Sequence, residues 1–201
     1  MKLYFSPGAC SLSPHIVLHE AGLPFTAERV DLRKKLTADG ADFLAVNPKG
    51  YVPALALDDG AVLTEGPAIV QYLADLAPQA GLLPPVGDVA RYKVLGWLAY
   101  ISSEIHKNFS PMFNPTATDE VKAYARKMLT LRLEHVAKQL EGRSFLADNF
   151  SVADAYLFTV LGWTDIIGFD LGGMPSLQAY RARIAERPAV QQAMREEGLL
   201  K

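Results

Sequence analysis

The strongest constraint on the fold is a change of pattern near residue 80. Before this point strand-like and helical segments alternate, and after it every periodic segment is helical. Prolines and glycines interrupt the chain between the two parts and remove all periodicity there, at Pro78, Gly81, Pro84, Pro85 and Gly87. The sequence therefore predicts two domains, residues 1–80 and 88–201, joined by a linker over 81–87.

The first part has the element order βαβαββα. Residues 25–32 alternate in polarity, as a half-buried strand does, and Asp58-Asp59-Gly60 is typical of a hairpin turn. Pro67 suits the first turn of a helix. The expected strands are 2–5, 25–32, 54–57 and 61–63, and the expected helices are 11–21, 37–46 and 66–77. A βαβ unit followed by a ββα unit predicts an α/β domain with a thioredoxin-like arrangement.

The pattern of the second part, residues 88–201, predicts an all-α domain. Apolar residues recur at helical spacing through each segment. Ser151 and Asp154 form a capping box at the start of one helix. The expected helices are 88–109, 118–140, 151–167, 176–185 and 189–195.

Composition excludes several classes of function. The net charge of −2 gives no reason to expect nucleic acid or a membrane surface as partner. No apolar run reaches membrane-spanning length, and no signal peptide is recognisable. A single cysteine fits a reducing compartment, so we expect a cytoplasmic protein. His15 and His19 are four residues apart on a predicted helix, but no further ligand accompanies them, so we expect no metal.

The single cysteine, Cys10, lies between the first strand and the first helix. A thiol at a helix N-terminus is stabilised as the thiolate by the helix dipole and by unpaired N–H groups. A lone cysteine can equally be a small buried hydrophobe. The strand–turn–helix position favours a reactive thiol.

Three other segments offer binding or catalytic groups. Pro53 precedes a strand, where it either starts that strand or, as a cis-proline, exposes the Val52 backbone to an extended peptide. Glu65 precedes a helix, where it either complements the dipole or pairs with the ammonium of an amino-acid head group whose carboxylate binds the helix N–H groups. His106 shares a helix face with Ala99 and Ser103 and is the best general acid or base by residue type, although a lone histidine is usually structural.

A group of large apolar residues near helix ends either walls a pocket or belongs to the core. Its members are Phe109, Met112, Phe113 and Trp163.

Taken together, these motifs resemble the bacterial beta-class glutathione S-transferases. The segments that carry the resemblance are SPGACSLSPHIVLHEAGLPF, VNPKGYVPAL, DDGAVLTEGPAIVQYLAD, SSEIHK and SVADAYLF, and the likeness extends to the C-terminal EEGLLK. The resemblance implies the glutathione S-transferase fold, a homodimer, and glutathione as co-substrate.

The resemblance also implies a role for each site residue. Cys10 would face the glutathione sulfur, with His106 close to it. Val52, before cis-Pro53, would pair with the backbone of the glutathione cysteine. Glu65 and Gly66 would hold the γ-glutamyl end, and Lys35 would reach the glycyl carboxylate. The segment Ser103, Glu104, Ile105 would bind glutathione across the dimer interface.

Two positions depart from the family pattern. Ala99 stands where many relatives have an asparagine that contacts glutathione, which removes one hydrogen bond of about 1 kcal/mol. Tyr51 replaces a frequent glutamine and would add an aromatic wall to the pocket of the second substrate.

Three functions are consistent with the sequence. The first is conjugation of glutathione to hydrophobic electrophiles, in detoxification or xenobiotic catabolism. The second is glutathione-dependent thiol–disulfide or peroxidase chemistry, since Cys10-Ser-Leu-Ser13 has the form of a single-thiol glutaredoxin motif. The third is a non-catalytic glutathione-binding module.

Overall fold

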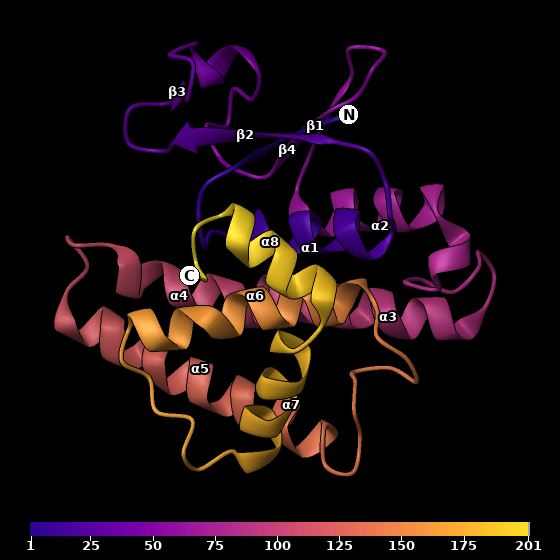
Figure 1. Cartoon of the computed structure of the whole chain (residues 1–201). Coiled ribbons are helices and arrows are strands. Elements are labelled where there is room, and N and C mark those ends of the chain that lie inside the picture. The colour runs from indigo at the N-terminus through magenta and orange to yellow at the C-terminus, as the bar shows by residue number, and fades with distance from the viewer. Residues whose placement is uncertain (201) are drawn as a thin grey trace. The chain divides into compact units, whose positions relative to one another are not determined.

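The computed structural model describes residues 1–200 and divides into two compact units. The first unit comprises residues 1–85 and the C-terminal segment from Arg187 onward, and the second comprises Val86–Glu186 (Figure 1). The first is an α/β unit and the second is all-helical, which confirms the predicted fold class.

A mixed five-stranded sheet forms the centre of the first unit. Its strands lie in the order β3-β2-β1-β4-β5. Strand β1 pairs in parallel with β2, with Lys2 opposite Thr26, and the other pairs are antiparallel. The strands are β1 (Lys2–Phe5), β2 (Thr26–Asp31), β3 (Leu36–Thr37), β4 (Ala54–Ala56) and β5 (Val62–Thr64).

Residues 37–46 do not form the predicted helix. Thr37 instead ends the short strand β3, and a 3-10 turn, η1 (Phe43–Ala45), follows it. Asp42 caps this turn by accepting a hydrogen bond from the Leu44 N–H at 2.9 Å, and Gly40 has φ +87°. The Asp42 side chain therefore satisfies a backbone N–H that a helix would otherwise bond, and the left-handed backbone at Gly40 is incompatible with a right-handed helix.

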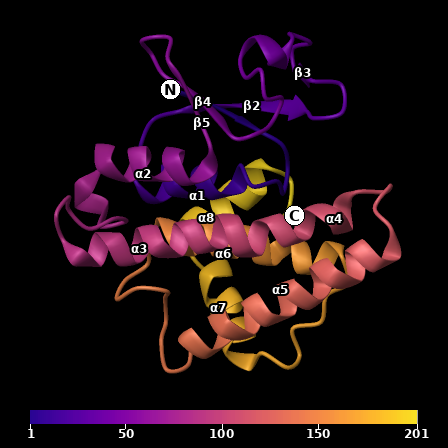
Figure 2. The ribbon, with the colours of Figure 1, turned by 180° about the vertical axis from the view of Figure 1, so that it is seen from behind.

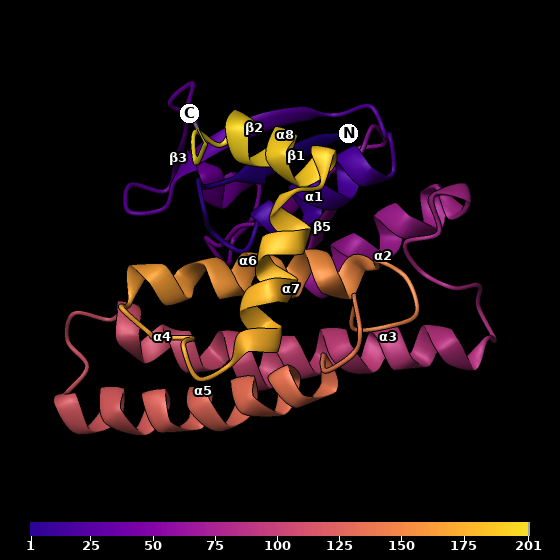
Figure 3. The same ribbon diagram turned by 60° about the horizontal axis from the view of Figure 1, so that its bottom comes forward.

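Helices α1 (Leu12–Glu20) and α2 (Gly66–Leu76) cover one face of the sheet, and a short turn, η2 (Pro78–Ala80), follows α2 (Figure 2). Helix α8 (Pro188–Glu196) lies beside α1 in the first unit (Figure 3). The sequence-based boundary placed α8 in the second domain instead. Long-range ion pairs explain its position, because Arg187 donates two hydrogen bonds to the Glu20 carboxylate at 2.6 and 2.8 Å.

The second unit is built around α6. All residues from Val152 to Leu161 on this helix are buried. The surrounding helices are α3 (Val89–Tyr100), α4 (Lys107–Phe113), α5 (Asp119–Gln139) and α7 (Pro175–Ala185), and α6 itself spans Val152–Ile166. A π-helical turn, η3 (Ile101–His106), joins α3 to α4, so the predicted helix 88–109 extends further and contains a local irregularity. Within residues 1–200, none of the helices combines the length and apolarity needed to cross a membrane.

The capping box at the start of α6 is confirmed, and it is larger than the sequence indicated. The fully buried Asp154 carboxylate accepts hydrogen bonds from the Ser151 N–H and the Leu146 N–H, both at 2.9 Å. The hydroxyls of Ser151 and Tyr180 donate to it as well, at 2.8 and 3.0 Å. Asp154 thus joins the start of α6, the preceding loop and α7.

Replacing Asp154 with alanine should lower the free energy of unfolding by about 3 kcal/mol, because buried N–H groups of Leu146 and Ser151 would lose their acceptor. Urea unfolding monitored by circular dichroism measures this change. The matched control is Asp148→Ala, at an exposed position of the same loop, which should stay within about 0.5 kcal/mol of the parent. Equal effects of the two substitutions would contradict the role given to Asp154.

Candidate active site

Cys10 lies in the turn before α1, next to the turn that precedes β4. Its Sγ donates a hydrogen bond to the Val52 carbonyl oxygen at 3.2 Å. The Val52–Pro53 peptide bond is cis, as the resemblance implied. The structure therefore brings together the thiol and the Val52 backbone, which are 42 residues apart in the sequence.

The thiol itself differs from the thiolate expected at a helix start. Burial raises the pKa of Cys10 to about 11, and the charges of Glu65 and Glu197 act in the same direction. The backbone N–H groups of Cys10 and Ser11 oppose this rise without reversing it. Desolvation thus outweighs the helix N-terminus, and the neutral thiol is a hydrogen-bond donor at physiological pH.

Glu65 occupies the N-cap position of α2 in an unusual backbone conformation. Its φ of 71° lies in the region that favours glycine, and such a conformation costs about 1–3 kcal/mol. The exposed carboxylate binds the Lys49 ammonium, with Nζ and Oε1 at 2.6 Å. Glu65 therefore presents a carboxylate that already pairs with an ammonium, directly before the first N–H groups of α2 at Gly66.

Lys35 and Tyr51 lie together in the same unit. The Lys35 ammonium donates to the Gly50 carbonyl oxygen at 2.8 Å and lies 5.7 Å from the centre of the Tyr51 ring. Tyr51 is 68% exposed. An ammonium donates up to three hydrogen bonds, so Lys35 retains capacity to bind an anion.

In the second unit, His106 contacts two side chains of α6. Its Nδ1 shares a hydrogen bond of 2.6 Å with the Tyr156 hydroxyl, and its ring meets that of Trp163 edge to face at 4.7 Å. Burial, together with the charge of Lys107, lowers the pKa of His106 to about 4. The near-neutral titration expected from residue type is therefore wrong for the free protein, in which His106 is neutral.

The residues just before His106 face different surroundings. Ser103 is exposed, and Glu104 accepts a hydrogen bond from Arg132 Nε at 2.8 Å. The side chain of Ile105 is fully buried. Ile105 therefore belongs to the core, and only its backbone remains to contact a ligand.

Three aromatic members of the predicted apolar group, Phe109, Phe113 and Trp163, pack against one another. The members of the group differ in how far their side chains are exposed. Trp163 packs edge to face on Phe109 at 5.3 Å and on Phe113 at 5.8 Å. Phe109 is fully buried, Met112 is half-buried, and Phe113 is 45% exposed. Phe109 and Trp163, the latter only 6% exposed, are thus core residues that support Phe113, and the prediction that they line a pocket is wrong.

Sequence reasoning missed Tyr156, Lys49 and Arg132. Tyr156 and Trp163 are seven residues apart on α6, a spacing that places them on one helix face and could have identified Tyr156. Lys49 and Arg132 pair with Glu65 and Glu104 over long separations that no local pattern reveals.

Comparisons with known proteins identify the family of this chain. The glutathione S-transferase N-terminal domain model matches residues 8–76, and the glutathione S-transferase C-terminal domain model matches residues 100–188. The chain belongs to the glutathione S-transferase family. This confirms the resemblance found in the sequence.

Whole-chain relatives support membership of this glutathione S-transferase family. The chain is 50% identical to glutathione S-transferase GstA of Escherichia coli O157:H7 over 200 residues, which cover 99% of this chain and 100% of the relative. It is 40% identical to glutathione S-transferase GST-4.5 of Xanthomonas campestris over 207 residues, again covering 99% of this chain and 100% of the relative.

Two solved structures are similar to this chain over its full length. A ternary complex of BphK, a bacterial glutathione S-transferase, matches with a TM-score of 0.97 and 58% identity, covering 99% of this chain and 100% of that one. A sphingomonad glutathione S-transferase complexed with glutathione matches with a TM-score of 0.96 and 49% identity, covering 100% of both chains.

Alkylation of Cys10 by iodoacetamide should be slow at pH 7 and should still be accelerating between pH 8 and 10, because the thiol has a pKa of about 11. Intact-protein mass spectrometry at each pH gives the rate, and Cys10→Ser gives the background. A rate that levels off below pH 8 would show a thiolate and contradict the buried neutral thiol.

The ring signals of His106 should titrate with a midpoint near pH 4 in proton NMR. The depressed pKa means that the folded state favours neutral His106, so stability from this residue is lost as pH falls from about 6.5 through 4. His106→Gln assigns the signals. A midpoint above pH 6 would contradict the burial of an uncharged ring.

Proposed function

We propose that this chain conjugates glutathione to hydrophobic electrophiles. The observation that carries the proposal is the Cys10 thiol against the Val52 carbonyl oxygen at 3.2 Å, beside a cis-proline. An extended peptide can pair with the Val52 backbone there, as an added strand does. Its cysteine would then lie next to the Cys10 thiol.

The remaining groups of the first unit suit the two ends of glutathione. Glu65 would bind the γ-glutamyl ammonium in place of Lys49, and the N–H groups at Gly66 would bind the adjacent carboxylate. Lys35 would bind the glycyl carboxylate, since its ammonium retains free donor capacity. One anionic and two positive groups thus match the one ammonium and two carboxylates of glutathione.

The chemical step needs a glutathione thiolate that is stabilised but still nucleophilic. On binding, the Cys10 S–H would turn from the Val52 carbonyl oxygen and donate its one hydrogen bond to that sulfur. The Nε2–H of a neutral His106 whose Nδ1 accepts from Tyr156 would donate a second. Neither side chain attacks the electrophile. The bond forms between the glutathione sulfur and the electrophilic carbon, and the leaving group departs with the electron pair.

The electrophile would contact the exposed rings of Tyr51 and Phe113 and the half-buried Met112, with the buried Trp163 supporting Phe113 from behind. These present apolar surface of the kind that binds small hydrophobic molecules. We further infer a cytoplasmic homodimer acting in detoxification or xenobiotic catabolism. In that dimer Ser103, Glu104 and the Ile105 backbone of one subunit would contact the glutathione of the other.

Thiol–disulfide chemistry is a weaker proposal for this chain. It would require Cys10 to act as a thiolate, and a pKa of about 11 leaves little thiolate at neutral pH. A non-catalytic module is weaker as well, because Cys10, Glu65 and His106 are all present.

Purified protein should bind immobilised glutathione and should conjugate it to at least one member of a panel of aryl halides, epoxides and organic halides. Product formation is followed by mass spectrometry of the glutathione adduct. Glutathione binding without turnover of any panel member would favour the non-catalytic module. Failure to bind glutathione would overturn the proposal.

Replacing Glu65 with glutamine should raise KM for glutathione roughly 10- to 100-fold while changing kcat much less, because a charge-assisted hydrogen bond to the ammonium is lost. The matched control is Glu134→Gln, an exposed acid on α5, which should leave both constants unchanged. The role of Glu65 fails if its substitution affects kcat alone or has no effect.

A further inference from the structure

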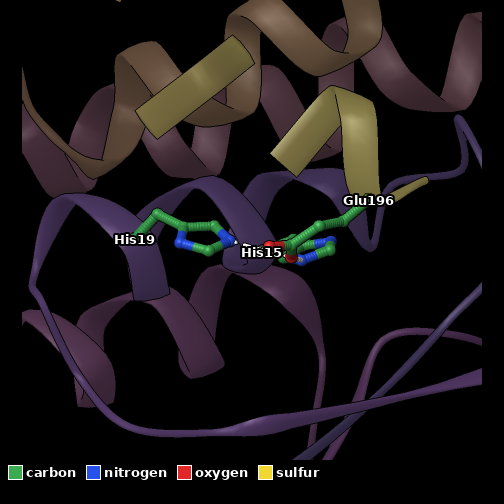
Figure 4. A group of neighbouring side chains, drawn as sticks. All are labelled: His15, His19 and Glu196. Carbon is green, nitrogen blue, oxygen red and sulfur yellow. Dashed lines mark hydrogen bonds and ion pairs between the residues drawn. The ribbon is translucent and has the colours of Figure 1, made fainter. Parts of the chain in front are cut away.

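The junction of α1 and α8 gathers two histidines and a carboxylate within the first unit. His15 Nε2 lies 2.8 Å from Glu196 Oε2, and His19 Nε2 lies 3.0 Å from the same oxygen. The three ligand atoms all lie within 4.8 Å of one another. Figure 4 shows the two rings on successive turns of α1, with Glu196 reaching them from α8.

His15 is held in one orientation from its other side. Its Nδ1 lies 3.0 Å from Glu197 Oε1, and Glu197 in turn accepts a hydrogen bond from the Gly8 N–H at 2.8 Å. A carboxylate only accepts, so both ring nitrogens donate in the metal-free protein, Nδ1 to Glu197 and Nε2 to Glu196. An ion would take the place of the Nε2 proton, while Glu197 keeps Nδ1 as the donor nitrogen. In metalloproteins, the ring nitrogen of a histidine ligand that does not bind the ion commonly donates to a carboxylate, as Nδ1 of His15 does here.

Packing also fixes both rings. The His15 side chain is fully buried, and its ring centre lies 5.6 Å from that of Phe5 and 5.5 Å from that of Phe25. The His19 ring meets Phe25 edge to face at 5.2 Å. The two Nε2 atoms are therefore preorganised, and ordering them on binding costs little further entropy.

We propose that His15, His19 and Glu196 form a binding site for a divalent transition-metal ion, with Zn²⁺ the best match. Two imidazole nitrogens and one carboxylate oxygen are a donor set that Zn²⁺ accepts in tetrahedral geometry, whereas Mg²⁺ and Ca²⁺ require mostly oxygen ligands. The fourth position would hold water, because His19 also lines a groove of about 530 Å³ together with Gln191 and Gln192.

The three ligand atoms, all within 4.8 Å of one another, must adjust to the spacing of a bound ion, and the partly exposed His19 and Glu196 can move. Bonds of about 2.0–2.1 Å in a tetrahedron place neighbouring ligand atoms roughly 3.3 Å apart. The present separations of 2.8 and 3.0 Å require Glu196 to withdraw by a few tenths of an ångström. Glu196 ends α8 and is partly exposed, so it can do this. Coordination releases any proton on either Nε2 to solvent and involves no change of oxidation state.

A bound ion would cross-link α1 to the last helix. It would tie the helix that follows Cys10 to a segment 177 residues away, and so would stabilise the first unit against unfolding. This site is independent of glutathione binding, and its test uses neither glutathione nor activity.

The test is a competition titration of metal-free protein with Zn²⁺ and a chromogenic chelator, together with Co²⁺ as a spectroscopic probe. Wild-type protein should bind one Zn²⁺ per chain, and Co²⁺ should give the absorption spectrum of a tetrahedral site. His19→Gln and Glu196→Gln should each weaken Zn²⁺ binding at least tenfold. Both positions are partly exposed, and circular dichroism checks that the variants fold.

Matched controls separate this site from other donors. His135→Gln removes an exposed histidine of the second unit, and Cys10→Ala removes the thiol, and neither should change Zn²⁺ affinity. Glu197→Gln should weaken binding 10- to 100-fold through the orientation of His15. Equal Zn²⁺ affinity in wild type and His19→Gln would overturn the proposal, as would loss of binding in Cys10→Ala.

Discussion

The hydrogen bond from the Cys10 thiol to the Val52 carbonyl is the contact on which the candidate site depends. It joins the turn that starts α1 to the turn that starts β4, and burial keeps the thiol protonated so that it can donate. A thiolate in the same place would face a carbonyl oxygen and the nearby charge of Glu65, and both contacts would be repulsive. The neutral state of Cys10 and the geometry of the turn therefore support each other.

The same principle governs the second unit. His106 is neutral because burial of its ring beside Trp163, together with the charge of Lys107, lowers its pKa to about 4. Desolvation thus turns both expected titrating groups, a cysteine and a histidine, into neutral hydrogen-bond donors. A neutral donor can stabilise a bound thiolate without transferring a full proton to it, which preserves its nucleophilicity.

Much of the fold follows from local sequence signals. The alternation before residue 80, the hairpin at Asp59-Gly60 and the capping box at Asp154 each depend on a few neighbouring residues, and each is present in the structure. The helix expected at 37–46 failed because side-chain capping by Asp42 and a left-handed Gly40 compete with helical hydrogen bonds.

What the sequence could not supply are contacts between distant segments and the effects of burial. The position of α8 depends on pairs such as Arg187 with Glu20, 167 residues apart, and the partner of the His15 and His19 pair is a carboxylate on that same helix. Likewise, residue type gives Cys10 and His106 ordinary pKa values, and only the packed structure reveals how far burial moves them.

The most direct test of this account is the ultraviolet thiolate absorbance of the protein–glutathione complex as a function of pH, compared between wild type and Cys10→Ala. The account predicts a glutathione thiolate at neutral pH in the wild-type complex, no thiolate signal from the free protein, and a midpoint shifted to higher pH in Cys10→Ala because a donor is lost. A thiolate signal in the free wild-type protein, or an unchanged midpoint in the variant, would contradict it.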